Sequence, residues 1–67
     1  MFYLIEISNA NGTIAKAIWD KNTLDEATMQ LHQTLASAMA NENVSSCLCE
    51  IINEKGAVQR HEYWARG

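Results

Sequence analysis

The sequence has 67 residues, of which 48% are hydrophobic, and its 5 basic and 8 acidic residues give a net charge of −3. This length corresponds to a single domain over residues 1–67, and the hydrophobic content argues against intrinsic disorder. The weak negative charge argues against nucleic-acid binding, because it offers no basic surface to a phosphate backbone. No stretch approaches the ~20 apolar residues of a membrane-spanning helix, so no membrane interaction is expected.

The first predicted element is a β-hairpin. Residues 2–8 (Phe-Tyr-Leu-Ile-Glu-Ile-Ser) are mainly β-branched and aromatic, which is typical of a strand, and residues 14–20 form the returning strand. Residues 9–13 (Asn-Ala-Asn-Gly-Thr) resemble a three-residue hairpin loop in which Gly12 adopts a positive φ as a G1 bulge.

The choice of loop decides the register of this hairpin. A three-residue loop pairs Glu6 with Lys16, two opposite charges, and we favour it for that reason. A two-residue turn at Asn11-Gly12 would instead place Glu6 opposite Ala17.

A helix is predicted to follow the hairpin. Thr23-Leu-Asp-Glu26 is a capping box, with Thr23 as the N-cap and Glu26 reaching back. Apolar residues recur at spacings of three and four, which predicts one buried stripe made of Leu24, Ala27, Leu31, Leu35, Ala38 and Met39. The helix should end near Ala40, with Asn41 in the left-handed conformation.

A second hairpin completes the chain. Residues 44–53 and residues 58–64 are predicted strands, and the loop between them repeats the Asn-x-x-Gly pattern of the first. The predicted register pairs Ile52 with Val58, Glu50 with Arg60, Cys49 with His61 and Cys47 with Tyr63.

The two hairpins resemble each other when one is shifted by 44 residues. Glu6, Ile7, Asn9 and Gly12 then coincide with identical residues in the second hairpin, namely Glu50, Ile51, Asn53 and Gly56. The match reflects either a pseudo-two-fold axis or the independent use of one hairpin design, and the sequence leaves both readings open.

These elements predict an α+β fold with the order ββαββ. The helix should cover one face of a four-stranded antiparallel sheet with the strand order 2-1-3-4, because the first strand is the most apolar and suits a central place. The order 1-2-4-3 is the alternative.

Both faces of the predicted sheet are apolar. We assign the odd-numbered strand positions to the helix, because Ala15 and Ala17 would let it approach closely. The even-numbered positions then form an uncovered face, although an antiparallel sheet with one solvated face normally alternates apolar with polar residues. The predicted interface consists of the large apolar residues of that face: Phe2, Leu4, Ile14, Ile18, Leu48, Ile52, Val58 and Trp64.

Three residues suggest metal or nucleophilic chemistry without a specific motif. Cys47 and Cys49 share one strand face, and His61 is predicted to lie opposite Cys49. Buried cysteines usually pack as small hydrophobic residues, so we predict core packing and no metal, cofactor or catalytic residue. Two cysteines without a secretory signal also indicate free thiols in a reducing compartment, which places the protein in the cytoplasm.

The two hairpins around one helix, ending in Glu62-Tyr63-Trp64, are similar to small uncharacterised ββαββ proteins of bacterial, often phage-derived, gene clusters. The resemblance implies a phage or mobile-element accessory protein, and it transfers neither an activity nor a functional residue.

The sequence therefore predicts a non-enzymatic protein-protein interaction module that forms a homo-oligomer, most simply a homodimer, through the uncovered sheet face, where another protein partner could also dock. A core of this size supplies only about 3–5 kcal/mol, so a second subunit would stabilise it. The alternative function is nucleic-acid binding by the same face, with aromatic residues stacking on bases.

Overall fold

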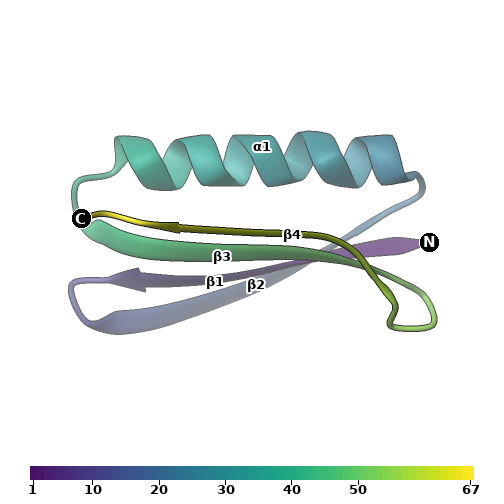
Figure 1. Cartoon of the computed structure of the whole chain (residues 1–67), viewed down its shortest axis with the longest axis horizontal. Helices are drawn as coiled ribbons and strands as arrows, with labels where there is room; N and C mark the ends of the chain where they lie inside the picture. Colours follow the sequence, from purple (N-terminus) through teal and green to yellow (C-terminus); the bar gives the residue numbers. More distant parts are fainter.

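The computed structural model covers the whole chain and shows four strands and one helix (Figure 1): β1 (Phe2–Ala10), β2 (Thr13–Lys21), α1 (Leu24–Ala40), β3 (Val44–Asn53) and β4 (Val58–Ala65). All neighbouring strands are antiparallel, and the sheet order is β2-β1-β3-β4. The predicted ββαββ architecture and the favoured strand order are both confirmed. The helix does not combine the length and apolarity needed to cross a membrane.

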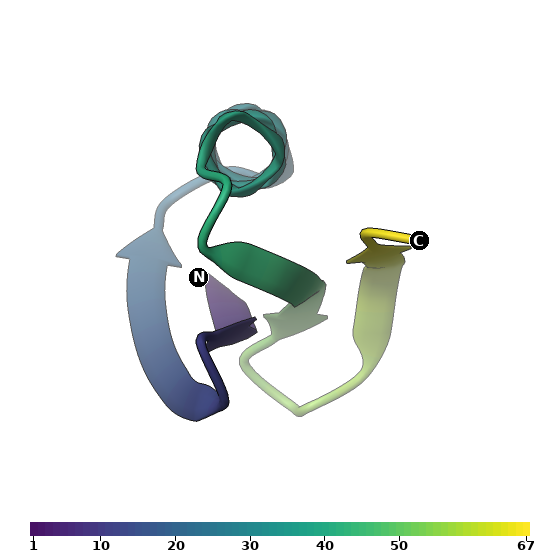
Figure 2. The same cartoon turned by 90° about the vertical axis from the view of Figure 1, so that its left-hand side faces the viewer.

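The domain has two layers, a sheet and one helix. Figure 2 looks nearly along the strands and shows α1 above one side of the sheet, with no element covering the other side. The core lies between these layers and consists of eight buried residues: Leu4, Ala27, Leu31, Ala38, Val44, Cys47, Cys49 and Ile51. The predicted buried stripe of the helix is wrong at its two ends, because Leu24 and Met39 are exposed.

The N-terminus of α1 is capped as the sequence predicts. The Glu26 backbone N–H donates to the Thr23 hydroxyl at 3.1 Å, which satisfies one of the free donors of the first helical turn. The Thr23 hydroxyl in turn donates to the Glu26 carboxylate at 3.3 Å.

The C-terminus of α1 is capped from a distance by an arginine. Asn41 is extended, with φ of −96°, so the predicted left-handed conformation at this position is wrong. Instead the Arg66 guanidinium, which follows β4, donates to the carbonyl oxygens of Met39 at 3.1 Å and Asn41 at 2.9 Å. The guanidinium also donates to the carbonyl oxygen of Val44 at 3.1 Å and lies 4.7 Å from the centre of the Trp64 ring. A positive charge at this end of the helix also complements the helix dipole.

The first hairpin has a two-residue turn, and the predicted register is wrong. Asn11 and Gly12 have φ of 54° and 81°, the positive values that a type I′ turn requires. Glu6 therefore pairs with Ala17, and Lys16 pairs with Ile7. The favourable twist of an Asn-Gly turn outweighs the exposed Glu–Lys pair, which would contribute only ~0.2–1 kcal/mol.

The second hairpin has a wider loop and a bulge. Asn53 closes the loop, because its side-chain oxygen accepts from the backbone N–H groups of Lys55 and Ala57, each at 2.9 Å. Ile52 pairs with Val58 as predicted, but Ile51 pairs with Arg60, so the ladder passes over one residue of β4. A bulge of one residue moves every later side chain of the strand to the opposite face.

The bulge overturns the remaining predicted pairs of this hairpin. Glu50 pairs with His61 and not with Arg60, and Cys49 pairs with Glu62 and not with His61. Cys47 pairs with Trp64 and not with Tyr63.

The 44-residue repeat does not correspond to a symmetry axis of the fold. A two-fold axis normal to the sheet, between β1 and β3, would keep equivalent side chains on the same face. Glu6 pairs with Cys49 and so shares its helix-facing side, whereas Glu50, its counterpart in the repeat, is the next residue of β3 and points the other way. The two loops also differ in length, so the matching residues reflect similar local chemistry.

We predict that Arg66 stabilises the fold through the end of α1. Replacing it with alanine (Arg66→Ala) leaves the last carbonyl groups of the helix without their charged donor and should lower the free energy of unfolding by about 1–3 kcal/mol. Chemical denaturation would measure this effect. The matched control is Arg60→Ala, because Arg60 makes only one exposed ion pair, with a distance of 3.9 Å, and should change stability by less than about 1 kcal/mol. Equal losses in the two variants would contradict a capping role.

Candidate functional site

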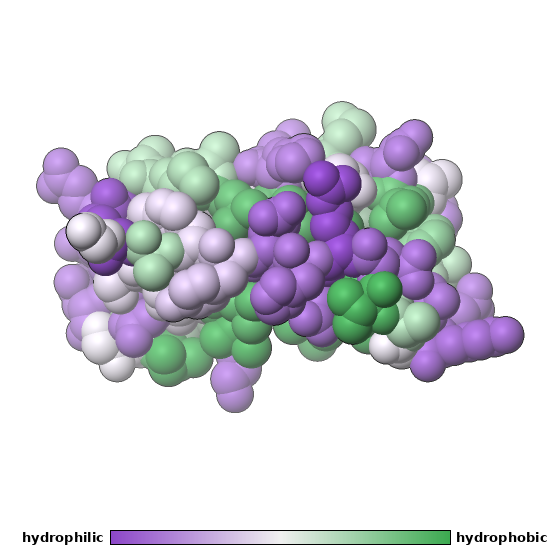
Figure 3. All heavy atoms as spheres, viewed as in Figure 1, coloured by the Kyte–Doolittle hydropathy of each residue, from purple (hydrophilic) through white to green (hydrophobic).

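The side of the sheet away from α1, which we call the outer face, is unusually apolar. Directly paired residues point to the same side of a sheet, so the observed registers define this face completely. Its large apolar residues are Tyr3, Ile5, Ile7, Ile14, Ile18, Leu48, Ile52, Val58 and Tyr63. In Figure 3 apolar residues appear along the lower rim of the molecule, on the side opposite α1.

Several of these side chains are strongly exposed. Ile18 retains 69% of its accessible surface, and Ile14, Val58 and Tyr63 are also exposed. The residues of the two central strands are half-buried, but only because their neighbours in the sheet flank them. Contiguous apolar surface of this kind marks interaction sites more often than scattered single residues do.

The predicted interface is partly misplaced. Ile14, Ile18, Leu48, Ile52 and Val58 lie on the outer face as predicted. The placement of the other three is wrong, because Leu4 is fully buried under α1 and Phe2 and Trp64 pack against the core. Tyr3, Ile5, Ile7 and Tyr63, which the sequence pattern did not indicate, also lie on the outer face.

The register of each hairpin is the reason that part of the predicted interface is misplaced. The two-residue turn makes odd positions of β1 share a side with even positions of β2, and the bulge exchanges the two sides of β4. The Asn11-Gly12 dipeptide was the sequence signal that could have revealed the first error.

The outer face carries few charged residues. Lys16 lies on β2 with no ion-pair partner among the salt bridges of the chain. On the other half of the sheet, the Glu50 carboxylate lies 2.9 Å from Nδ1 of His61. Asp20, at the end of β2, is the remaining acidic residue.

The cysteines and the histidine do not form a cluster. Cys47 and Cys49 are buried under α1 with their sulfur atoms 3.8 Å apart, and both are free thiols. The predicted proximity of His61 is wrong, because His61 lies on the outer face. No group of three or more histidine, cysteine or acidic side chains is arranged to hold a metal ion.

Burial keeps both thiols protonated. The pKa of Cys49 is raised to about 12, chiefly by desolvation and in addition by the neighbouring Cys47 thiol and the Glu6 and Glu62 carboxylates. Desolvation likewise raises the pKa of Cys47. Because the thiolate is the reactive form, neither side chain is prepared for nucleophilic chemistry.

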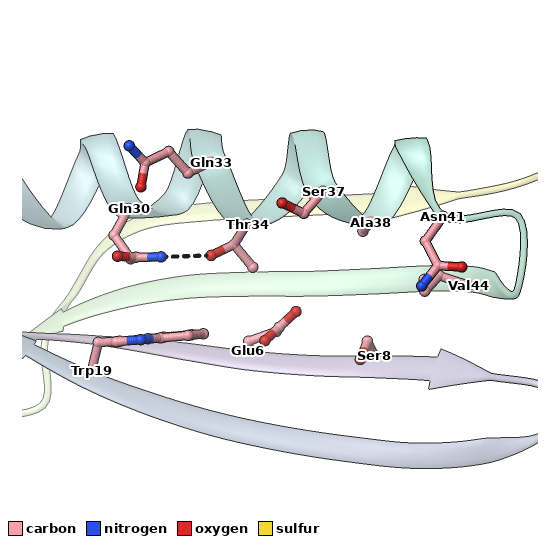
Figure 4. Close-up of a pocket in the computed structure, with 10 residues that line it drawn as sticks. All are labelled: Glu6, Ser8, Trp19, Gln30, Gln33, Thr34, Ser37, Ala38, Asn41 and Val44. Atoms are coloured by element: carbon pink, nitrogen blue, oxygen red, sulfur yellow. Dashed lines mark hydrogen bonds between the residues drawn. The ribbon is translucent and has the colours of Figure 1, made fainter.

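A cleft of about 400 Å³ lies on the opposite side of the sheet, between α1 and strands β1 and β2. Ten residues line it: Glu6, Ser8, Trp19, Gln30, Gln33, Thr34, Ser37, Ala38, Asn41 and Val44. Figure 4 shows Glu6 and Trp19 on the sheet side of this cleft and Gln30 and Thr34 on the helix side. This cleft was not predicted from the sequence, although a glutamate within the apolar run of residues 2–7 is a visible signal of it.

Comparison with known proteins found no matching family model, no matching curated protein and no matching solved structure.

We predict that Cys49 makes stability fall at alkaline pH. Its pKa rises from an ordinary value of 9.0 to about 12 on folding, so the unfolded chain releases this proton at lower pH than the folded protein. The associated stabilisation is fully present below pH 9.0 and is lost as the pH rises towards 12, by up to about 1.4 kcal/mol per pH unit.

Urea denaturation at a series of pH values, applied to the wild type and to Cys49→Ala, would measure this loss. Tyrosines and lysines titrate in both proteins, so the difference between them isolates the thiol. The variant should lose stability less steeply above pH 9.0. Parallel curves would show that the thiol has no such role.

Proposed function

We propose that this chain is a non-catalytic protein-protein interaction module that forms a homodimer through its outer face. The observation that carries the proposal is the set of nine large apolar side chains on a sheet face that no element of the chain covers. Covering one such side chain contributes roughly 1.5–3 kcal/mol, a large gain for a domain with only eight buried hydrophobic residues. We also place the module in the cytoplasm, because both of its cysteines are free thiols.

The size of the face favours a second copy of the chain as the partner. The molecule measures 33 × 17 × 16 Å, so a face of 33 × 17 Å covers about 560 Å² in projection. The accessible surface of a corrugated face exceeds its projection. Full cover would therefore approach the roughly 800 Å² per partner of a standard stable interface, and two packed sheets are a common way to achieve it.

The charges of the face also favour self-association. In a two-fold symmetric interface, if one residue meets a second across the interface, the second meets the first in return. The outer face carries a lysine, Lys16, on the β2 side and a carboxylate, Glu50, on the β3 side. Because Asp20 also lies on β2, neither sign of charge dominates the face and two copies do not repel, whereas two faces of a single charge sign would.

The same charges disfavour the alternative of nucleic-acid binding. A sheet that stacks bases needs a path of basic residues for the phosphates. On the outer face Lys16 is the only lysine or arginine and is accompanied by Asp20 and Glu50, and the chain as a whole has a net charge of −3.

Sedimentation equilibrium at micromolar concentration tests the homodimer, with Ile18→Glu as the disruptive variant. The substitution acts in both copies and removes about 1.5–3 kcal/mol in each, so dimer affinity should fall by at least about 100-fold. Met29→Glu is the matched control, because Met29 on α1 is 62% exposed, close to the 69% of Ile18, and lies away from the outer face.

Two results would contradict the homodimer. One is a wild-type chain that stays monomeric throughout the micromolar range, and the other is an equal effect of the two substitutions. Salt-sensitive binding of a single-stranded oligonucleotide that is lost in Ile18→Glu would instead support the nucleic-acid alternative.

A further inference from the structure

The cleft under α1 contains a carboxylate that has no cationic partner. Glu6 is half-buried at the centre of β1, where its neighbours across the sheet are Ala17 and Cys49. The only hydrogen bond of the Glu6 carboxylate is accepted from the Cys47 thiol, with a sulfur–oxygen distance of 3.7 Å. None of the ten residues that line the cleft is lysine, arginine or histidine. Partly burying a carboxylate costs free energy unless a charge or strong donor compensates it, so this site favours a positively charged occupant.

The walls of the cleft supply neutral hydrogen-bonding groups. Gln30 donates through its amide nitrogen to the Thr34 hydroxyl at 3.2 Å, which leaves the Gln30 carbonyl oxygen free to accept. Gln33 and Ser37 line the same wall of the helix. A ligand group that carries several donors and no acceptor matches such a lining.

The end of the cleft is aromatic. Trp19 lies on β2 at the sheet side of the cleft, together with Glu6 (Figure 4). The face of an indole ring attracts cations, and the planar guanidinium group stacks on it while its N–H groups donate to a carboxylate in the same plane. An ammonium group has no such plane and keeps its hydration more strongly.

We propose that the cleft between α1 and strands β1 and β2 binds a guanidinium group on an alkyl chain, with Glu6 as its counter-ion and Trp19 as its stacking surface. The group could come from a small guanidino compound or from an arginine side chain of a peptide. The proposal is independent of the homodimer, because the cleft and the outer face lie on opposite sides of the sheet.

The test is a titration of the ¹⁵N-labelled full chain followed by nuclear magnetic resonance, with N-butylguanidinium as the probe. Saturable shifts are expected at the Trp19 indole N–H and at the Gln30 and Gln33 side-chain amides, with a dissociation constant on the order of 1 mM for so small a ligand. N-butylurea has the same shape but no charge, and it should produce no saturable shift at equal concentration.

Two variants identify the counter-ion. Glu6→Gln keeps the side-chain shape and should weaken binding at least about tenfold. Glu62→Gln is the matched control, because Glu62 also points to the helix side but does not line the cleft. Comparison of the variant spectra with that of the wild type determines whether each variant is folded. If Glu6→Gln does not fold, the comparison of N-butylguanidinium with N-butylurea on the wild type still tests whether the cleft selects the charged group.

The source of the group is distinguished by a second pair of ligands. Agmatine represents free guanidino compounds, and N-acetylarginine amide represents an arginine in a peptide; the tighter binder identifies the source. The proposal is overturned if N-butylguanidinium causes no saturable shift, if N-butylurea shifts the same signals equally, or if Glu6→Gln binds as tightly as the wild type.

Discussion

A four-stranded sheet has two faces, and a single helix can cover only one of them. In this chain both faces are apolar, so the fold satisfies one face internally and leaves the other to water. The residues between α1 and the sheet form the whole core, with Leu4 and Ile51 fully buried on the two central strands. The uncovered face carries five isoleucines, whereas the covered face carries one, Ile51. This imbalance is the physical reason to expect association, since loss of water from apolar surface drives both folding and binding.

The covered face is itself only partly apolar. Its two cysteines, Leu4 and Ile51 pack beneath the buried stripe of α1, while Glu6 and Glu62 point to the same side. The polar cleft lies between α1 and this side of the sheet, where Glu6, Ser8 and Trp19 line it from the strands. One side of the sheet thus offers chemistry suited to a small charged group, and the other offers surface suited to a protein.

The end of the chain holds the two layers together. Arg66 follows the last strand and reaches the final carbonyl groups of α1, while the Trp64 ring, over which its guanidinium lies, packs against the core. A helix with no basic residue in its last turn thereby obtains its positive charge from a distant part of the sequence. Such a contact between the edge strand and the helix restrains both elements at once.

Local patterns in the sequence determined the elements and their order. The capping box at Thr23, the helical spacing of apolar residues and the two Asn-x-x-Gly loops depend on neighbours along the chain, and the ββαββ order and the sheet order followed from them. The composition likewise showed that both sheet faces are apolar. Five of the eight predicted interface residues therefore lie on the outer face.

Only the tertiary structure decided which side each strand presents to the helix. Side chains alternate with a period of two, so a turn shorter by one residue at Asn11-Gly12, or one bulged residue in β4, moves a whole row to the other face. For this reason Leu4 lies in the core, Trp64 packs against the core, and Glu6 lines the cleft. The cap supplied by Arg66 was likewise beyond prediction, because it joins residues more than twenty positions apart that only the finished sheet brings together.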